Sequence, residues 1–163
     1  MRTILLVSVS AMLLAATEAD DADQMKVISE IKACMASENL DSLDPIRTNN
    51  EARTSQEKCF IGCMMKNLHV LNSDGQYDSA LLKEHMSHCP EMAKDPQKKA
   101  DTLLVAEDCA AKVTGCNGYC ECGVVAGNCL AQGMEAKGHE TKYTTGFETS
   151  WRRCMLRSGP SGT

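Results

Sequence analysis

Residues 54–72 read TSQEKCFIGCMMKNLHVLN and place Cys59 and Cys63 four residues apart within a helical pattern. Four residues turn an α-helix by about 400°, so the two sulfur atoms leave nearly the same face, one turn apart. Two such positions within one helix fit a mutual disulfide poorly. We therefore expect each cysteine to bond a different segment. Apolar residues recur at helical spacing through the same stretch, at Phe60, Met64, Leu68 and Leu71.

The rest of the chain shows helical periodicity and no alternation typical of strands. Apolar positions three and four apart predict helices over 21–37, 79–88, 96–113, 119–132 and 143–156. Leu40, Leu43 and Ile46 predict one or two further helical turns. The sequence therefore predicts an all-α domain of about six short helices.

Capping residues mark the starts of three of these helices. Thr54 or Ser55 is the expected N-cap of the central helix, and Asp78 is the expected N-cap of the next one. Asp95 precedes Pro96, which suits the first position of a helix. Each of these helices therefore has a defined start in the sequence.

The run NSDG at 72–75 is a turn signal that is expected to end the central helix. It does not fit a calcium-binding EF-hand loop. With Gly75 at the sixth loop position, Val70 and Leu81 would occupy positions that need acidic ligands. The turn is therefore expected to be structural.

The N-terminus resembles a secretory signal, with Arg2, an apolar run over 4–16, and the small residues Thr17 and Ala19. The alternatives are an uncleaved anchor or a buried helix, but the run is shorter than the roughly 20 residues of a comfortable membrane span. We expect a signal peptide at 1–19, one helical domain over 20–157 and a disordered tail at 158–163.

Composition narrows the function classes. Ten cysteines in an exported chain predict up to five disulfides rather than metal ligands. The formal net charge of −5 argues against a nucleic-acid partner, because no basic stripe is present to neutralise phosphates. Aromatic residues make up 4% of the chain, so a core must come mainly from aliphatic residues and methionine.

The order and spacing of six cysteines resemble the insect odorant-binding protein family, of the pheromone and general odorant-binding type. Three residues separate the second from the third and eight separate the fifth from the sixth; the six are Cys34, Cys59, Cys63, Cys109, Cys120 and Cys129. The stretch LNSDGQYD at 71–78 also resembles that family. The resemblance spans almost the whole expected mature chain.

The resemblance implies three disulfides, namely Cys34–Cys63, Cys59–Cys120 and Cys109–Cys129. This pairing agrees with the helix geometry. Cys120 and Cys129 are nine residues apart, about 900° of helix, so their side chains leave opposite sides of the helix predicted over 119–132. Four further cysteines make the chain a cysteine-enriched variant, and the sequence leaves their partners open: Cys89, Cys116, Cys122 and Cys154.

The resemblance further implies a secreted carrier that reversibly binds a small hydrophobic molecule, odorant-like or pheromone-like, in an internal apolar pocket. Disulfide-linked helices would hold that pocket open, and no catalysis and no cofactor are expected. Contact with a membrane or a receptor fits such a carrier, and the sequence leaves its oligomeric state open. An ordinary core position is the alternative for each candidate lining residue: Met25, Ile28, Leu81, Met86, Leu104, Val125, Phe147 and Trp151.

His85 and His88 lie three residues apart on a predicted helix, next to Cys89. Zinc needs a third and fourth ligand, and the sequence offers none, so no metal site is expected. The histidines change charge near pH 6.5, so a pH switch and solvated surface positions are the remaining interpretations.

Three rival classes are weighed against the carrier. An enzyme lacks support, because the chain has no Gly-x-Ser-x-Gly elbow, no His-Glu-x-x-His and no Asp-x-Cys-Cys motif. A plant-type lipid-transfer protein needs adjacent cysteines, which are missing here. A secreted interaction protein, such as a venom component or an inhibitor, remains open and would show an exposed apolar patch over a packed interior.

Overall fold

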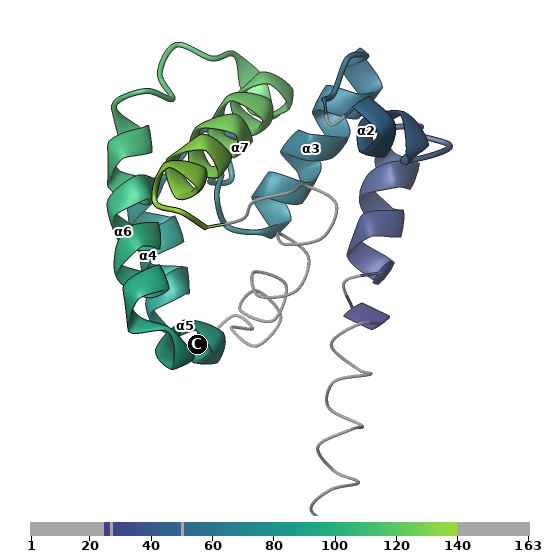
Figure 1. Ribbon diagram of the computed structural model, residues 1–163. Coiled ribbons are helices and arrows are strands. Elements are labelled where there is room, and N and C mark those ends of the chain that lie inside the picture. The colour runs from purple at the N-terminus through teal and green to yellow at the C-terminus, as the bar shows by residue number, and fades with distance from the viewer. Residues whose placement is uncertain (1–24, 27, 50, 140–163) are drawn as a thin grey trace, which may run out of the picture.

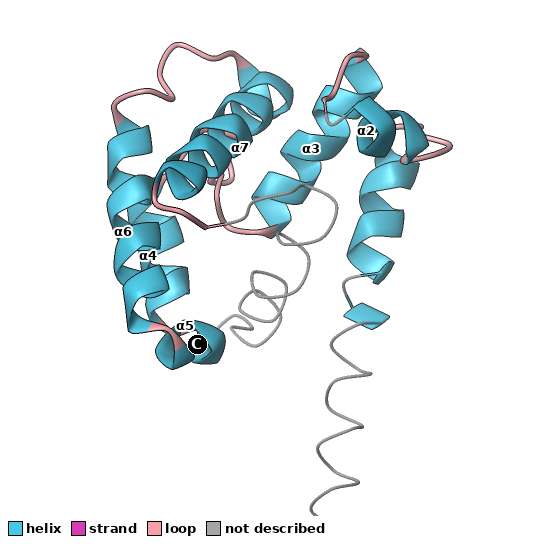
Figure 2. Cartoon of the chain, in the orientation of Figure 1, coloured by secondary structure: helices cyan, strands magenta, loops and turns pink. Residues whose placement is uncertain are grey.

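The computed structural model describes residues 25, 26, 28–49 and 51–139, with backbone only at 47–49, 90 and 91. These residues form an N-terminal helix over 28–37 and six labelled helices (Figure 1): α2 (Asp44–Asn49), α3 (Ser55–Asn67), α4 (Ser79–Ser87), α5 (Pro90–Lys94), α6 (Pro96–Ala110) and α7 (Gly118–Ala136). Within them the only strand-like pairing is an isolated antiparallel bridge between Leu71 and Tyr77. Figure 2 shows the described residues as helices and loops, with no strand. The prediction of an all-α fold is confirmed.

The helices are arranged around the crossing of α3 and α7 (Figure 1). Helix α7 also packs on α6, and α6 packs on α4 and α5. The N-terminal helix and α2 lie on the other side of α3 from α6, as the purple and blue ribbons of Figure 1 show. In the part of the chain that is described, no helix is both long enough and apolar enough to span a bilayer.

The N-terminus of α3 is fixed by a capping box. Thr54 Oγ1 accepts a hydrogen bond from the Glu57 N–H at 3.2 Å, and Glu57 Oε2 accepts from the N–H groups of Thr54 at 3.2 Å and Arg53 at 2.6 Å. These hydrogen bonds to the carboxylate lower the pKa of Glu57, with that from the Arg53 N–H contributing most. Of the two residues predicted as N-cap, Thr54 and Ser55, Thr54 is the N-cap.

The predicted length of the central helix is wrong, because α3 ends at Asn67 rather than just before Asn72. His69 has a φ of +52°, which takes the chain out of the helix, and Val70 and Leu71 then turn into the main core. The helical spacing of apolar residues continues in the sequence past Asn67. The burial of Val70 and Leu71 in the core outweighs that local preference, so the helix ends earlier.

The turn at 72–75 is confirmed as structural. Asn72 Oδ1 accepts from the N–H groups of Asp74 and Gln76, each at 3.0 Å. Gly75 has a φ of +78° and is buried beside Tyr119, where an added Cβ would lie 2.8 Å from the Tyr119 Cβ. The turn is thereby attached to the start of α7.

Aspartate caps define the next helices as the sequence predicts. Asp78 accepts from the Leu81 N–H and Asp95 from the Lys98 N–H, each at 2.9 Å. Helix α4 ends at Ser87, one residue before its predicted end at His88, and Pro90 then begins the short helix α5, which the sequence did not predict. Proline fits a first helical position as well as it fits a break, so the residue alone does not separate the two.

Helix α7 runs to Ala136, four residues beyond its predicted end at Gln132. Gly133, the first residue after the predicted end, lies inside the helix, where an added Cβ would lie 2.4 Å from Val105 Cγ1. The glycine is there because α6 and α7 pack closely, at a cost in helix propensity of about 1 kcal/mol.

Candidate ligand-binding site

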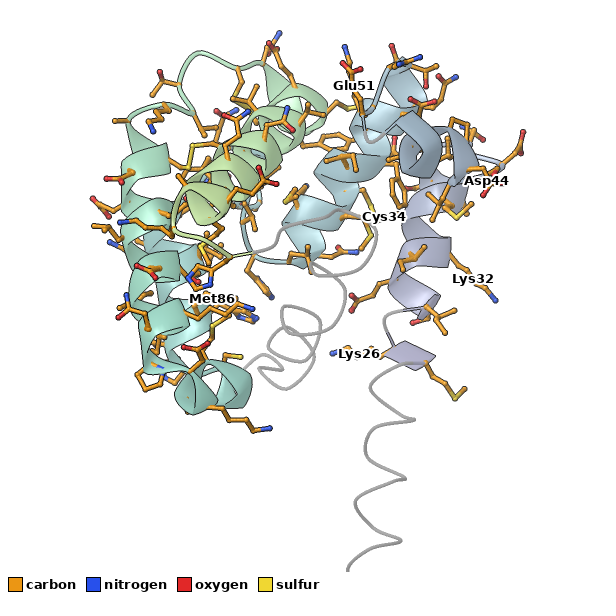
Figure 3. The ribbon with its side chains drawn as sticks, in the orientation of Figure 1. Lys26, Lys32, Cys34, Asp44, Glu51 and Met86 are labelled. Carbon is orange, nitrogen blue, oxygen red and sulfur yellow. A yellow bond between two sulfur atoms is a disulfide. The ribbon has the colours of Figure 1, made fainter. Side chains whose placement is uncertain are left out.

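All three disulfides implied by the family resemblance are present. Cys34–Cys63 joins the N-terminal helix to α3, Cys59–Cys120 joins α3 to α7, and Cys109–Cys129 joins α6 to α7; their Cα–Cα distances are 5.7, 4.0 and 5.9 Å. Figure 3 shows Cys34 on the N-terminal helix directed toward α3. The expectation that Cys59 and Cys63 bond different segments is confirmed, as is the position of α7 between two partners.

A fourth disulfide joins Cys116 to Cys122, with a Cα–Cα distance of 5.2 Å. It attaches the α6–α7 loop to the first turns of α7. Cys89 is also disulfide-bonded, and no cysteine of the described residues is a free thiol. Cys154 lies outside the described residues.

Tyr119, at the start of α7, contacts both α3 and the end of the N-terminal helix. Its hydroxyl donates to Glu38 Oε1 at 2.9 Å, at the end of the N-terminal helix, and its ring lies 5.6 Å from Lys66 Nζ on α3. Its backbone contacts Gly62, where an added Cβ would lie 2.2 Å from the Tyr119 carbonyl oxygen. Burial and the hydrogen bond to the Glu38 carboxylate raise the pKa of Tyr119.

The buried side chains form two clusters. The larger one joins residues of α3–α7 and the 70–71 segment around Leu82, Met86 and Leu130. The smaller one consists of Cys34, Ile46 and Phe60, with Ile31 and Met35 of the N-terminal helix packed against it. Ile61 on α3 contacts both clusters. Helix α3 therefore lies between the two clusters and contributes residues to both.

The candidate lining residues fall in different environments. Met86 is fully buried in the larger cluster (Figure 3), and Leu81 on the same helix is half-buried. Met25 and Ile28 are 71% and 48% exposed, and Leu104 and Val125 are 49% and 36% exposed. Phe147 and Trp151 lie outside the described residues. That these residues line one pocket stays a prediction.

A surface hollow of about 460 Å³ lies where α2, residues 51–53, α3 and α7 meet. Its apolar lining includes Ile46, Ile61 and Val124, and its rim carries Arg53, Lys58 and Glu51. Arg53 Nε lies 3.6 Å from Glu51 Oε2, which is labelled in Figure 3. Because both side chains are largely exposed, this ion pair adds little stability. The hollow has the size of a ligand pocket, and its charged rim suits a partly polar ligand.

A second hollow, of about 430 Å³, runs along the outer face of α7 beside the end of α6. Val125, one of the predicted lining residues, borders it together with Lys112, Asn128 and Gln132. The sequence reading missed most of the residues around both hollows, because they belong to exposed faces that periodicity assigns to solvent.

Three histidines lie near one another. The rings of His69 and His85 have centroids 4.6 Å apart, and His88 Nδ1 lies 2.9 Å from the Glu84 carbonyl oxygen. Burial lowers the pKa of His85, and the positive charges that His69 and His88 acquire on protonation lower it further. The part of the chain that is described contains no group of three or more metal-ligating side chains. A pH switch through these histidines stays a prediction.

A buried carboxylate on α6 contacts the residues that follow α7. Asp101 Oδ2 accepts from Gln97 Nε2 at 3.1 Å and lies 3.0 Å from His139 Nε2. The hydrogen bond with His139 contributes most to lowering the pKa of Asp101, followed by that from Gln97. This contact fixes the end of α7 against α6.

Comparison with known proteins places this arrangement in a family. The PBP/GOBP family matches residues 16–133. General odorant-binding protein 28a of Drosophila melanogaster is 28% identical over 116 residues, which cover 70% of this chain and 78% of that protein. The solved structure of odorant-binding protein dmelOBP28a from Drosophila melanogaster has the same fold, with a TM-score of 0.56 at 23% identity, over 71% of this chain and 94% of that one. The chain therefore belongs to the PBP/GOBP family of insect odorant-binding proteins.

Proposed function

We propose that this protein is a secreted carrier that reversibly binds small hydrophobic molecules in an internal apolar pocket and performs no catalysis. Membership of the PBP/GOBP family is the observation that carries the proposal. The name of the fly relative, a general odorant-binding protein, supports an odorant-like ligand. Secretion is supported by the signal-like residues 1–19 and by the disulfides, with residues 20–157 as the carrier domain.

The energetics of such binding are favourable without any covalent step. A ligand that transfers about 300 Å² of apolar surface out of water gains about 7 kcal/mol. Micromolar affinity corresponds to about 8 kcal/mol, so burial of this size with one or two polar contacts reaches that range. Because the disulfides hold α3, α6 and α7 together, less core packing is needed to keep the helices in place.

A probe-displacement titration tests the proposal. Oxidised mature protein is mixed with a fluorescent apolar probe, and aliphatic and aromatic odorants are added as competitors. The chain has a single tryptophan, Trp151, so its emission reports directly whether that predicted lining residue meets the ligand. We expect competitors to displace the probe and to be recovered chemically unchanged. No displacement by any compound would contradict the carrier role.

The substitution Leu81→Ala tests whether a candidate lining residue contacts the ligand, since Leu81 is a half-buried candidate. Leu103→Ala is its control, because Leu103 is half-buried against the larger cluster and is not a candidate. We expect the first substitution to weaken ligand binding more than the second at similar stability. Equal effects would remove Leu81 from the site without removing the carrier role.

The second candidate function is a secreted interaction protein built on the same scaffold. The exposed apolar side chains of Leu104 and Val125 favour it, because an interaction surface displays such groups. The titration separates the two functions. An interaction protein with a packed interior leaves the probe undisplaced by odorants, whereas a carrier releases the probe.

A further inference from the structure

The dipeptide Asn117-Gly118 lies at the junction of the α6–α7 loop and α7. Both residues are exposed, and Gly118 has a φ of +71° with no neighbouring atom within 4 Å of the position that a Cβ would occupy. Apart from its own chain neighbours and the backbone of α7, nothing crowds the Cβ position of Gly118 beside this peptide bond. The sequence marks it only as a helix break.

The reactive groups of this dipeptide are not engaged. Asn117 occupies the N-cap of α7, but its side chain makes no capping hydrogen bond. Its backbone N–H donates instead to Glu121 Oε2 at 2.9 Å. Gly118 is the first residue of α7, so its N–H has no partner within the helix, and no other described group accepts from it. Among the described residues, neither the Asn117 side-chain amide nor the Gly118 backbone N–H that follows it has a hydrogen-bond partner.

We propose that Asn117 is a site of spontaneous deamidation in the folded protein. The Gly118 backbone nitrogen loses its proton and attacks the Asn117 Cγ, and ammonia leaves with that proton as a five-membered succinimide closes. Water then opens the ring. Cleavage of the new N–Cγ bond gives aspartate, and cleavage of the original peptide bond gives isoaspartate. Glycine favours ring closure because it has no side chain to hinder the approach.

A second dipeptide, Asp74-Gly75, shows how exposure and hydrogen bonding determine whether the succinimide ring can close. The same ring closure there would release water and isomerise Asp74. However, the Gly75 N–H donates to the Asn72 carbonyl at 3.0 Å, and Gly75 is buried beside Tyr119. The nitrogen that must attack is thus held in a turn, and reaction requires that the turn open first.

Deamidation at Asn117 changes the start of α7 in two distinguishable ways. Aspartate adds a negative charge at the N-cap, where it favours the helix dipole and can accept the free N–H groups of the first turn. Isoaspartate adds a backbone atom between Cys116 and Cys120, both of which are disulfide-bonded. The first product preserves the α7 start, and the second strains it.

The test is to age oxidised full-length mature protein in mildly alkaline buffer, folded or unfolded in urea with its disulfides intact, and to map peptides by mass spectrometry with isoaspartate detection. At Asn117 we expect the folded rate to stay within about tenfold of the unfolded rate, which is about 1.4 kcal/mol of opening free energy. At Asp74 we expect folding to slow the reaction by more than about a hundredfold.

Asn117→Gln is the control, because its longer side chain would have to close a larger and slower ring. It should remove the acidic product in the folded protein and leave the slow Asp74 reaction unchanged. The proposal is overturned if Asn117 is protected by folding as strongly as Asp74, or if the acidic form also accumulates in Asn117→Gln. Ligand affinity does not enter the readout, so the outcome is independent of the proposed carrier function.

Discussion

The crossing of α3 and α7 predicts a large effect for one added methyl group. In Gly123→Ala, the new Cβ would lie 2.4 Å from Gly62 Cα and 2.9 Å from Gly62 N. Ordinary contacts between carbon atoms begin near about 3.5 Å, so the two helices would have to separate by about 1 Å. The Cys59–Cys120 disulfide lies one turn away and holds its Cα atoms 4.0 Å apart, which resists that separation.

The magnitude follows from two opposing contributions. Overpacking costs about 1–3 kcal/mol, and the upper end applies because the obstacle is backbone and not a flexible side chain. Replacing a helical glycine with alanine returns up to about 1 kcal/mol. We therefore expect a net loss of about 2 kcal/mol in the free energy of unfolding. Urea unfolding followed by circular dichroism, with disulfides intact, should show a midpoint about 1 M lower.

Gly133→Ala provides a matched control in the same helix. Its added Cβ would meet Val105 Cγ1 at 2.4 Å, but a valine side chain can change rotamer, so the loss should be smaller. Gly62→Ala combined with Gly123→Ala should cost less than the sum of the two, since the first already separates the helices. If Gly123→Ala is as stable as the wild type, or loses no more than Gly133→Ala, the close crossing does not constrain this fold.

Three further predictions concern the titratable groups and the additional disulfide. The pKa of His85 is below its ordinary 6.5, so the unfolded chain binds the proton more readily; stability should fall as pH drops below about 6.5, and His85→Gln should flatten that slope in urea titrations. The pKa of Asp101 is also lowered, so the stability that its ionised form contributes is present above its ordinary pKa of 3.8 and is lost as pH falls below that value. Asp101→Asn should therefore make unfolding less dependent on pH in acid. An unchanged dependence of stability on acid pH would contradict the role given to the contact with His139. Replacing Cys116 and Cys122 together with serine should cost about 2 kcal/mol, because the pair encloses a short loop, and calorimetry that finds no loss would show that the loop is ordered without it.

Helix starts could be predicted from the sequence because they depend on local chemistry. The pairing of the six cysteines was implied instead by the resemblance of their order and spacing to the family, because the bonded residues lie far apart in the chain. Thr54, Asp78 and Asp95 accept hydrogen bonds from their own next turns, which a single sequence displays. Helix ends could not be predicted as well. The end of α3 at Asn67 and the continuation of α7 through Gly133 depend on partners from distant segments.

The candidate lining residues show a related limit. Met86 and Leu104 carry the same signal, an apolar residue at helical spacing, yet the first is fully buried and the second is half-exposed. Periodicity identifies the apolar face of a helix but not whether that face meets the core, a pocket or solvent. A signal for the α3–α7 crossing was present: Gly62 follows Cys59 by three residues, and Gly123 follows Cys120 by three. Equal offsets from two bonded cysteines place both glycines at one crossing point.

The distribution of constraints bears on how a carrier of this kind admits a ligand. The Cys59–Cys120 and Cys109–Cys129 disulfides and the Gly62–Gly123 contact all act on α7, so α3, α6 and α7 form one tightly connected unit.

The N-terminal helix is connected differently. Among the described residues, its disulfide and its contact with Tyr119 both lie near its C-terminal end, at Cys34 and Glu38. Ile28 at the other end of this helix, and Met25 before it, are 48% and 71% exposed. Because the described residues at this end are mostly exposed and carry no disulfide, we expect them to separate from the body at lower cost than α3, α6 or α7. In the proposed carrier, ligand entry beside this helix end requires less opening than entry through the disulfide-linked unit.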